Sequence, residues 1–446
     1  MQDPQNESFK RDNVAQCATM GVEHTTYIIA AAYKKEERMR QGLSSVTRLI
    51  TILGCTLTIV STSVQAQEII HKGGATGVKV TPGNTQKLDF ITARVRTLPK
   101  APMSVSAQAG QDFIHNLVNQ FQSPVQTSAE VDVGETEGFE GDGITDPVEL
   151  GTPLIIGDTQ EGLEFQSQQF GPSNHPFSTA RADLASGPTK IPTPTNTMYP
   201  YRATGKLFFK IGSDTYVCSG SLIKRGLVVT AAHCVTDYGT RTLFTNFRFV
   251  PGYRQGQAPY RVWAASRVWV PTRYFNGAAT QCAPTAPGVV CKDDVAVIEL
   301  APQTNPTYPG TSTGWYGYRW NQWGITGAGL TQVTQLGYPI ALDGGLLMQR
   351  TDSQGFVASA TLMSNTIIGS LMTGGSSGGP WLNNFGIQPV GTGPAGTYAT
   401  PNIVIGVTSW GYTDATIKQQ GASPFSSSNI VTLVNNACAG SDPRCL

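Results

Sequence analysis

The stretch Thr230-Ala231-Ala232-His233-Cys234 contains the one histidine found in residues 199–446. The pair Asp293-Asp294 follows, with Asp294 lying 61 residues after the histidine. The string Gly374-Gly375-Ser376-Ser377-Gly378-Gly379-Pro380 places Ser377 a further 83 residues on. An imidazole, a carboxylate and a hydroxyl are the parts of a nucleophilic serine hydrolase. Because this half of the chain offers no second histidine, His233 is the expected base.

Two further strings accompany these three, Cys218–Ile223 before the histidine and Val407–Gly411 near the C-terminus. Together, and in this order, the five strings resemble segments of the trypsin-like serine peptidase family. The resemblance covers residues 199–446 and not the upstream half. Within the family, Thr373–Ser377 resembles the bacterial glutamyl-endopeptidase branch.

The resemblance implies a role for each residue of the site. Ser377 would be the nucleophile and His233 its general base, while Asp294 would orient the imidazole. The backbone N–H groups of Gly375 and Ser377 would form the oxyanion hole. Asp294 directly precedes Val-Ala-Val, as in the family. Asp293 stays open as the orienting residue if the strand register is shifted by one.

The resemblance also implies that Ser409-Trp410-Gly411 pairs its backbone with an extended substrate. An ordinary tryptophan of a barrel core is the alternative for Trp410. Two positions depart from the family pattern. Ser376 stands where the family usually has an aspartate, and Ser409 stands where the glutamyl branch has a histidine, so a preference for glutamate is in doubt. Leu371 and Met372 suggest a less polar pocket wall.

Short apolar runs separated by Gly, Pro and Asn follow Tyr199, and such runs are typical of strands. They are Lys206–Ile211, Gly226–Thr230, Phe247–Val250, Val262–Val270, Val295–Leu300 and Ile403–Trp410. Near the end, Ser428 is the expected cap of a helix whose buried face carries Ile430, Leu433 and Val434. The residues therefore predict an all-β domain with a C-terminal helix. The family resemblance adds two packed β-barrels with the site in the cleft between them.

Residues 1–66 are predicted to be an N-terminal extension and a secretory signal. The apolar run Leu49–Ala66 follows Arg40 and Arg48 and ends in small residues suited to cleavage. The run is too short and too rich in threonine for a stable membrane span. A lipoprotein acylated at Cys55 and a buried core helix are the alternatives. We therefore expect a secreted protein, extracellular or periplasmic.

Residues 67–198 are predicted to be an acidic pro-region that ends in a Pro- and Thr-rich linker. This region holds 15 acidic and 8 basic residues, whereas residues 199–446 hold 9 acidic and 16 basic. Opposite charges favour docking, so the pro-region is a candidate intramolecular inhibitor of a zymogen. A solvated, disordered tether is the alternative. The whole chain has a net charge of +1, which gives no indication of nucleic-acid binding.

Six of the eight cysteines follow the signal and form three pairs close in sequence. In an exported protein they are expected to form disulfides. The pairs are Cys218 with Cys234, Cys282 with Cys291, and Cys438 with Cys445. The family resemblance supports the first pair alone. An all-cysteine zinc site is the alternative, and no metal or other cofactor is expected.

The expected function is that of a secreted serine endopeptidase, which hydrolyses protein or peptide substrates through an acyl-enzyme. A catalytically inactive, peptidase-like binding module is the alternative. A lipase or esterase of the α/β-hydrolase type needs its histidine after the serine. No histidine follows His233, so that class is excluded.

Overall fold

The computed structural model describes residues 68–80, 88–101, 134–151, 154–156, 177–186, 191–281, 289–290, 292–304, 307–321, 330–357, 366–386, 400–415 and 417–446. Residues 65–446 form one compact unit, and all described residues belong to it. The predicted signal lies outside the described residues. Among the described residues, no helix has the length and hydropathy needed to cross a membrane.

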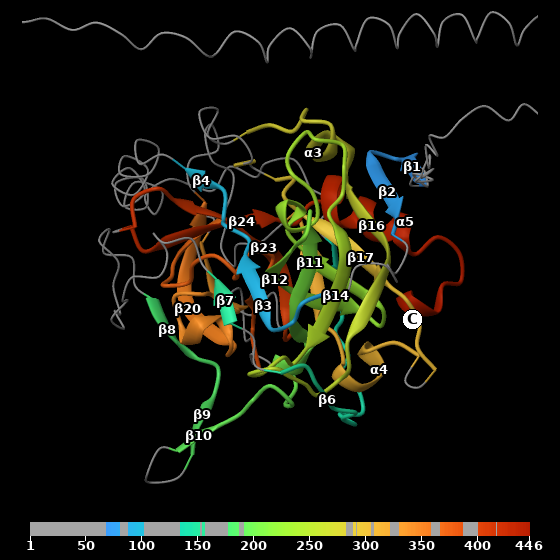
Figure 1. Cartoon of the computed structure of the whole chain (residues 1–446). Helices are drawn as coiled ribbons and strands as arrows, with labels where there is room; N and C mark the ends of the chain where they lie inside the picture. Colours follow the sequence, from blue (N-terminus) through green and yellow to red (C-terminus); the bar gives the residue numbers. More distant parts are fainter. Residues whose placement is uncertain are drawn as a thin grey trace, which may run out of the picture. The chain divides into compact units, whose positions relative to one another are not determined.

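Six strands of the first half of the predicted peptidase region close into a barrel (Figure 1). In ring order they are β11 (Thr204–Ile211), β12 (Asp214–Lys224), β13 (Leu227–Thr230), β17 (Ala296–Leu300), β16 (Trp263–Pro271) and β14 (Thr245–Pro251). The ring closes because β16 pairs with both β14 and β17. Leu207, Phe208 and Phe209 on β11 are fully buried in its core. Closure leaves no unpaired edge within the ring.

A second ring of six strands follows in the chain. In ring order it consists of β19 (Leu330–Gly337), β20 (Gln349–Val357), β21 (Thr366–Gly369), β24 (Gln419–Pro424), β23 (Ile403–Tyr412) and β22 (Pro380–Asn383). Its core holds Val333, Ile368, Trp381, Ile403 and Ile405. The strand β18 (Gly317–Trp320) adds to β23 in parallel. The predicted all-β fold with two barrels is confirmed.

The C-terminal helix is also confirmed, although it begins earlier than predicted. A π-helical turn, Ser427–Val431, leads into α5 (Thr432–Ala437). The cap is Ser426 and not Ser428, because the N–H of Ser426 donates to Asn429 Oδ1 at 2.7 Å. On the buried face, Ile430 and Leu433 are fully covered by the barrel core.

Segments of residues 68–198 add strands to both barrels. The hairpin β1 (Ile69–Lys72) and β2 (Ala75–Lys79) extends the first barrel at β16, and β3 (Thr92–Val95) pairs with β12 and with β7 (Leu154–Ile156). On the second barrel, β4 (Lys100–Ala101) pairs with β23, β5 (Gly134–Thr136) with β18, and β8 (Phe177–Arg181) with β20.

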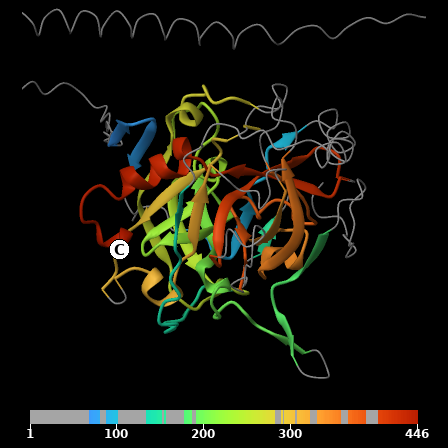
Figure 2. The same ribbon diagram turned by 180° about the vertical axis from the view of Figure 1, so that it is seen from behind.

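The remaining short elements are β6 (Val148–Glu149) on β15 (Gln257–Ala258), the ribbon of β9 (Leu184–Ser186) and β10 (Ile191–Thr193), α3 (Thr272–Phe275) and α4 (Gly310–Thr313). Figure 2, seen from behind, shows the β9–β10 ribbon pointing away from both barrels.

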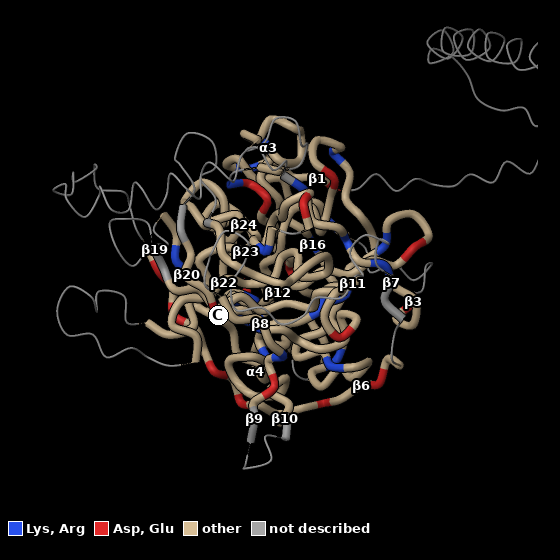
Figure 3. Tube along the Cα trace, turned by 90° about the vertical axis from the view of Figure 1, so that its left-hand side faces the viewer, with Lys and Arg blue, Asp and Glu red and all other residues tan. Residues whose placement is uncertain are grey.

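Charged pairs join these upstream segments to the barrels. Four acidic residues of the upstream half contact arginines of the barrels, and the pairs are Glu68–Arg267, Glu135–Arg319, Asp146–Arg261 and Asp183–Arg254. The Arg319 side chain is almost completely buried in its pair. Figure 3 shows acidic and basic residues interspersed along the chain. Three further pairs have the opposite sense, Arg94–Asp214, Arg96–Asp237 and Arg181–Asp343, so charged contacts of both senses join the two halves.

Two of the expected disulfides lie in the described part of the chain. Cys218 on β12 is joined to Cys234 next to His233, and Cys438 is joined to Cys445. Cys282 and Cys291 lie outside the described residues.

Replacing both Cys218 and Cys234 by serine is expected to lower the free energy of unfolding by about 3 kcal/mol, because the bridge closes a loop of roughly 15 residues. Urea denaturation of the double variant measures this loss. The matched control replaces Cys438 and Cys445, whose shorter loop predicts a smaller loss of about 2 kcal/mol. Equal stability of the wild type and the first double variant would contradict the prediction.

Lys206 on β11 is a buried base in the first barrel. Its Nζ donates to the Gly345 carbonyl at 2.6 Å and lies 4.7 Å from the centre of the Tyr253 ring. Complete burial lowers the pKa of Lys206 from 10.5 to about 7. Between these two values the unfolded chain binds a proton that the folded chain lacks, so stability rises with pH across this window.

Urea denaturation between pH 7 and 10 is therefore expected to show a free energy of unfolding that rises with pH, by at most about 1.4 kcal/mol per unit from this group. The Lys206→Met variant should lose this rise. Lys79→Met removes a lysine whose side chain is 59% exposed and is the control for loss of charge. Identical pH dependence in the wild type and Lys206→Met would contradict the prediction.

Candidate active site

The three residues expected to form the triad come from three elements of the two barrels. His233 lies in a 3-10 turn, Ala232–Cys234, that follows β13. Asp294 lies just before β17, which is the antiparallel neighbour of β13. Ser377 lies in the loop before β22 of the second barrel. Barrel closure therefore brings Asp294 into contact with His233, 61 residues away in the sequence, and the Ser377 carbonyl accepts a hydrogen bond from Ser219 of the first barrel.

Asp294 holds His233 through two contacts. Its Oδ2 lies 2.7 Å from His233 Nδ1, and its Oδ1 accepts the His233 backbone N–H at 2.8 Å. Ser409 Oγ donates to the same Oδ2 at 2.6 Å. Asp294 is fully buried, so these donors replace the water that its carboxylate would otherwise bind. The arrangement fixes the imidazole with Nε2 free for another partner.

The neighbouring Asp293 faces a different partner. One of its oxygens lies 2.6 Å from Arg273 Nε. Burial raises the pKa of Asp293, and Arg273 acts in the opposite direction. Of the two carboxylates left open by the sequence, Asp294 is thus the one in contact with His233.

Ser377 Oγ and His233 Nε2 are both buried, and neither has a hydrogen-bond partner among the described residues. Buried polar atoms normally have hydrogen-bond partners, so the absence of a partner at these two atoms calls for an explanation. The Ser377 carbonyl accepts the N–H of Ser219 on β12 at 2.8 Å, which ties the loop to the first barrel. Ser377 is therefore held by its backbone and His233 by its backbone and Nδ1, while Ser377 Oγ and His233 Nε2 stay unpaired.

The loop before Ser377 requires glycine at position 375. Gly375 has φ +93°, and a Cβ there would come within 2.5 Å of the Tyr338 carbonyl oxygen. Glycine alone adopts this conformation at little cost. In this conformation the Gly375 N–H points to the carbonyl of Arg96, with a long separation of 3.4 Å.

A network of neutral side chains supports this loop beneath Ser376. Ser376 Oγ donates to the Thr373 carbonyl at 2.7 Å. Gln420 Nε2 donates to the Met372 carbonyl at 2.8 Å and contacts Ser376 Oγ at 3.3 Å. Gln335 Nε2 donates to Gln420 Oε1 at 2.6 Å. Sequence reasoning missed Gln335 and Gln420, because no local pattern distinguishes them from other strand residues.

The three expected substrate-binding residues all lie on β23, and each has different surroundings. Ser409 turns to Asp294, while Trp410 is fully buried with its ring centre 5.2 Å from that of Tyr412. The Gly411 N–H donates to the carbonyl of Pro99 at 3.0 Å. The backbone of this strand therefore already binds an extended segment, and that segment belongs to the same chain.

A cavity of about 310 Å³ lies beside Gly411. Leu371, Met372 and Thr373 line one side of it, and Leu98 and Lys100 are among the residues that line another. Leu371 and Met372 are almost fully buried, so the wall that they form is apolar.

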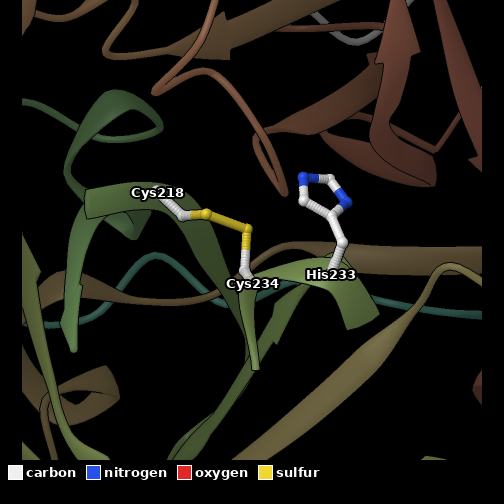
Figure 4. Close-up of side chains that lie close together, drawn as sticks. All are labelled: Cys218, His233 and Cys234. Carbon is white, nitrogen blue, oxygen red and sulfur yellow. A yellow bond between two sulfur atoms is a disulfide. The ribbon is translucent and has the colours of Figure 1, made fainter. Parts of the chain in front are cut away.

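Cys218, His233 and Cys234 lie close together, with potential metal-ligand atoms within 4.8 Å of one another (Figure 4). Zinc binds cysteine as a thiolate. The two sulfurs are joined in a disulfide. These three residues are thus unsuited to hold zinc in the state described here.

Residues 194–431 match the Trypsin family over more than half of the chain, and the protein belongs to this family. The curated relatives include an extracellular metalloprotease of Bacillus subtilis (strain 168), 29% identical over 201 residues, covering 43% of this chain and 55% of the relative. They also include a glutamyl endopeptidase of Bacillus licheniformis, 26% identical over 184 residues, covering 41% of this chain and 49% of the relative. The chain thus spans about half the length of these relatives. The expected kinship with the glutamyl-endopeptidase branch is confirmed.

Among solved structures, the protease Anisep from Arthrobacter nicotinovorans is 26% identical, with a TM-score of 0.42. The match covers 54% of this chain and 97% of that one.

Proposed function

We propose that this protein is a secreted serine endopeptidase with Ser377, His233 and Asp294 as its catalytic triad. The observation that carries the proposal is the buried Asp294–His233 pair, whose Nε2 is unpartnered, together with an equally buried and unpartnered Ser377 Oγ on a loop that is hydrogen-bonded to the barrel of His233. A serine hydroxyl attacks a peptide carbonyl only when a base takes its proton in the transition state. In a structure without substrate, the hydrogen bond between nucleophile and base is often long.

The proposed reaction follows from these positions. Ser377 Oγ attacks the substrate carbonyl carbon while His233 Nε2 takes the proton, and the backbone N–H groups of Gly375 and Ser377 stabilise the oxyanion. His233 then gives the proton to the leaving amine, which leaves an acyl-enzyme. A water molecule, activated by His233 in the same way, hydrolyses the ester. Asp294 stabilises the imidazolium in both steps.

The substrate would pair its backbone with Gly411 on β23 and place one side chain in the adjoining cavity. Leu371 and Met372 form an apolar wall there, whereas Asp414 and Lys418 also line the cavity, so the cavity by itself does not define which side chain it accepts. Ser409 is engaged with Asp294 and supplies no cation for a glutamate side chain. Glutamyl specificity belongs to the relative that carries this name.

The N-terminal half completes the proposal. Residues 1–66 direct secretion, residues 67–198 form a pro-region, and residues 199–446 form the peptidase domain. The pro-region acts as an intramolecular inhibitor. Its strands on both barrels and the four charged pairs described above support this role, because they hold it against the peptidase domain.

Labelling with a small fluorophosphonate tests the proposed function. Because the pro-region is proposed to cover the site reversibly, the reaction uses excess reagent and a long incubation. We expect the full chain then to carry one phosphonate group, located at Ser377 by peptide mass spectrometry, and the Ser377→Ala variant to carry none. The alternative, an inactive binding module, predicts no labelling of either chain. Labelling at Ser376 instead would contradict the assignment of the nucleophile. Cleavage of a peptide library, measured on the same preparation before and after labelling, then connects Ser377 to peptide hydrolysis.

A further inference from the structure

We propose that residues 94–101, the cleft segment, occupy the substrate cleft in the direction opposite to that of a substrate and block it without being cut. This inference rests on the proposed function and names the segment that regulates the site. It assigns the occupant of the cleft as an extended peptide of this chain, anchored by Arg96.

The cleft segment enters along the first barrel. There β3 runs parallel to β12, with Arg94 opposite Tyr216 and Val95 opposite Val217. The Arg96 N–H donates to the Val217 carbonyl at 3.0 Å. The segment is therefore a strand added to the barrel that carries His233.

Arg96 anchors the segment at the reactive centre. Its Nε donates to the backbone carbonyl of His233 at 3.0 Å, and its guanidinium pairs with Asp237. The guanidinium also lies 5.2 Å from the centre of the Phe244 ring. The Arg96 carbonyl, in turn, faces the Gly375 N–H, which is one of the two proposed oxyanion donors. The segment thus occupies a donor that a substrate carbonyl would need.

The segment leaves along the second barrel. The Pro99 carbonyl accepts the Gly411 N–H at 3.0 Å, and β4 then runs parallel to β23 with Lys100 opposite Gly411. Leu98 is 3% exposed and lines the cavity formed with Leu371 and Met372. The segment therefore covers both the backbone and the side-chain subsite that a substrate would use.

The direction of the cleft segment explains why the proposed peptidase would not cleave it. His233 protonates the leaving amine, so the residues after a scissile bond must lie on the barrel of His233, and the residues before it on β23. The cleft segment has the reverse arrangement, because Val95 lies on β12 and Pro99 lies on β23. The nitrogen of Thr97, which would be the leaving group, therefore lies on the side of the carbonyl away from His233. Without a proton for this amine, attack on the Arg96 carbonyl reverts and the bond stays intact.

The test uses the full chain and the variant Arg96→Ala, which removes the contacts to His233 and Asp237. Arg94→Ala is the matched control, since Arg94 lies two residues before Arg96, carries the same charge and pairs with Asp214 with both side chains half exposed. Loss of one charge-assisted contact corresponds to roughly a tenfold change in an equilibrium. We expect kcat/KM for short peptides to rise about tenfold or more in Arg96→Ala and to stay at the wild-type value in Arg94→Ala.

A second measurement is independent of catalysis. In the Ser377→Ala background, hydrogen exchange at the Gly411 amide is expected to accelerate about tenfold on adding Arg96→Ala, and not on adding Arg94→Ala. Leu98→Ala, which removes most of a side chain that is 3% exposed, should act in the same direction and serves if Arg96→Ala does not fold. Equal exchange rates in all these chains would overturn the inference.

The outcomes separate the two proposals. Faster exchange with no hydrolysis or labelling in any variant would refute the proposed function and leave the covered cleft standing. Hydrolysis by the wild type at the rate of Arg96→Ala would overturn the blocking role. Intact-mass analysis of the incubated wild type is expected to find no cut between Arg94 and Ala101. A cut there would overturn the reversed direction.

Discussion

Ser377→Ala and His233→Ala are each expected to lower kcat for peptide hydrolysis by about a million-fold, because nucleophile and base act as a unit. Both variants should still fold. Ser377 Oγ has no hydrogen-bond partner among the described residues, so alanine removes no such contact. In His233→Ala, the backbone N–H and Ser409 Oγ remain as donors to Asp294.

Steady-state hydrolysis of a peptide substrate, with circular dichroism for folding, measures these effects. The measurement is best made in the Arg96→Ala background, which exposes the cleft. Ser221→Ala is the matched control, since Ser221 Oγ on β12 is also buried and has no hydrogen-bond partner among the described residues. Activity within tenfold of the parent chain in either triad variant would refute the assignment.

Asp294→Asn is expected to lower kcat by about ten-thousand-fold. The carboxylate accepts from the His233 ring, from the His233 backbone and from Ser409. An amide in its place has one oxygen and one NH₂ group, so it cannot accept all three bonds. The imidazole then loses its orientation and the charge that stabilises its protonated form.

Asp293→Asn is the matched control for this experiment. The substitution removes the same charge one residue away, from a carboxylate that pairs with Arg273. We expect its kcat to stay within a few-fold of the parent chain. A larger loss in Asp293→Asn than in Asp294→Asn would show that the strand register places the other carboxylate at the base. Measuring kcat from pH 6 to 9 for both variants tests whether the loss at one pH reflects only a shift of the pH optimum.

The neutral network beneath Ser376 bears on how the site is controlled. In this chain, hydrogen bonds from Gln420 to Ser376 and Met372 hold the loop of Gly375. Such bonds need no carboxylate at position 376. If the loop is already ordered, control has to act on access to the cleft. The cleft segment would supply that control.

Much of the fold could be predicted from the sequence. The apolar runs predicted strands such as β11 and β17 because short apolar segments bounded by turn residues are read locally in the sequence. The face formed by Ile430, Leu433 and Val434 predicted the C-terminal helix, although its cap was misplaced by two residues because a π-helical turn precedes α5. The strings around His233 and Ser377 were sufficient to indicate the chemistry of the proposed site.

By itself, then, the sequence determined the kind of fold, the family and the candidate residues, since each depends on short segments read locally. Only the tertiary structure decided that Asp294 rather than Asp293 contacts His233, and that Ser409 bonds to that carboxylate. It also decided the network of Gln335 and Gln420 and the position of Arg96 between His233 and Gly375. These contacts join residues tens to hundreds of positions apart. The closure and packing of two barrels creates them, and no local pattern in the chain encodes which distant strand becomes a neighbour.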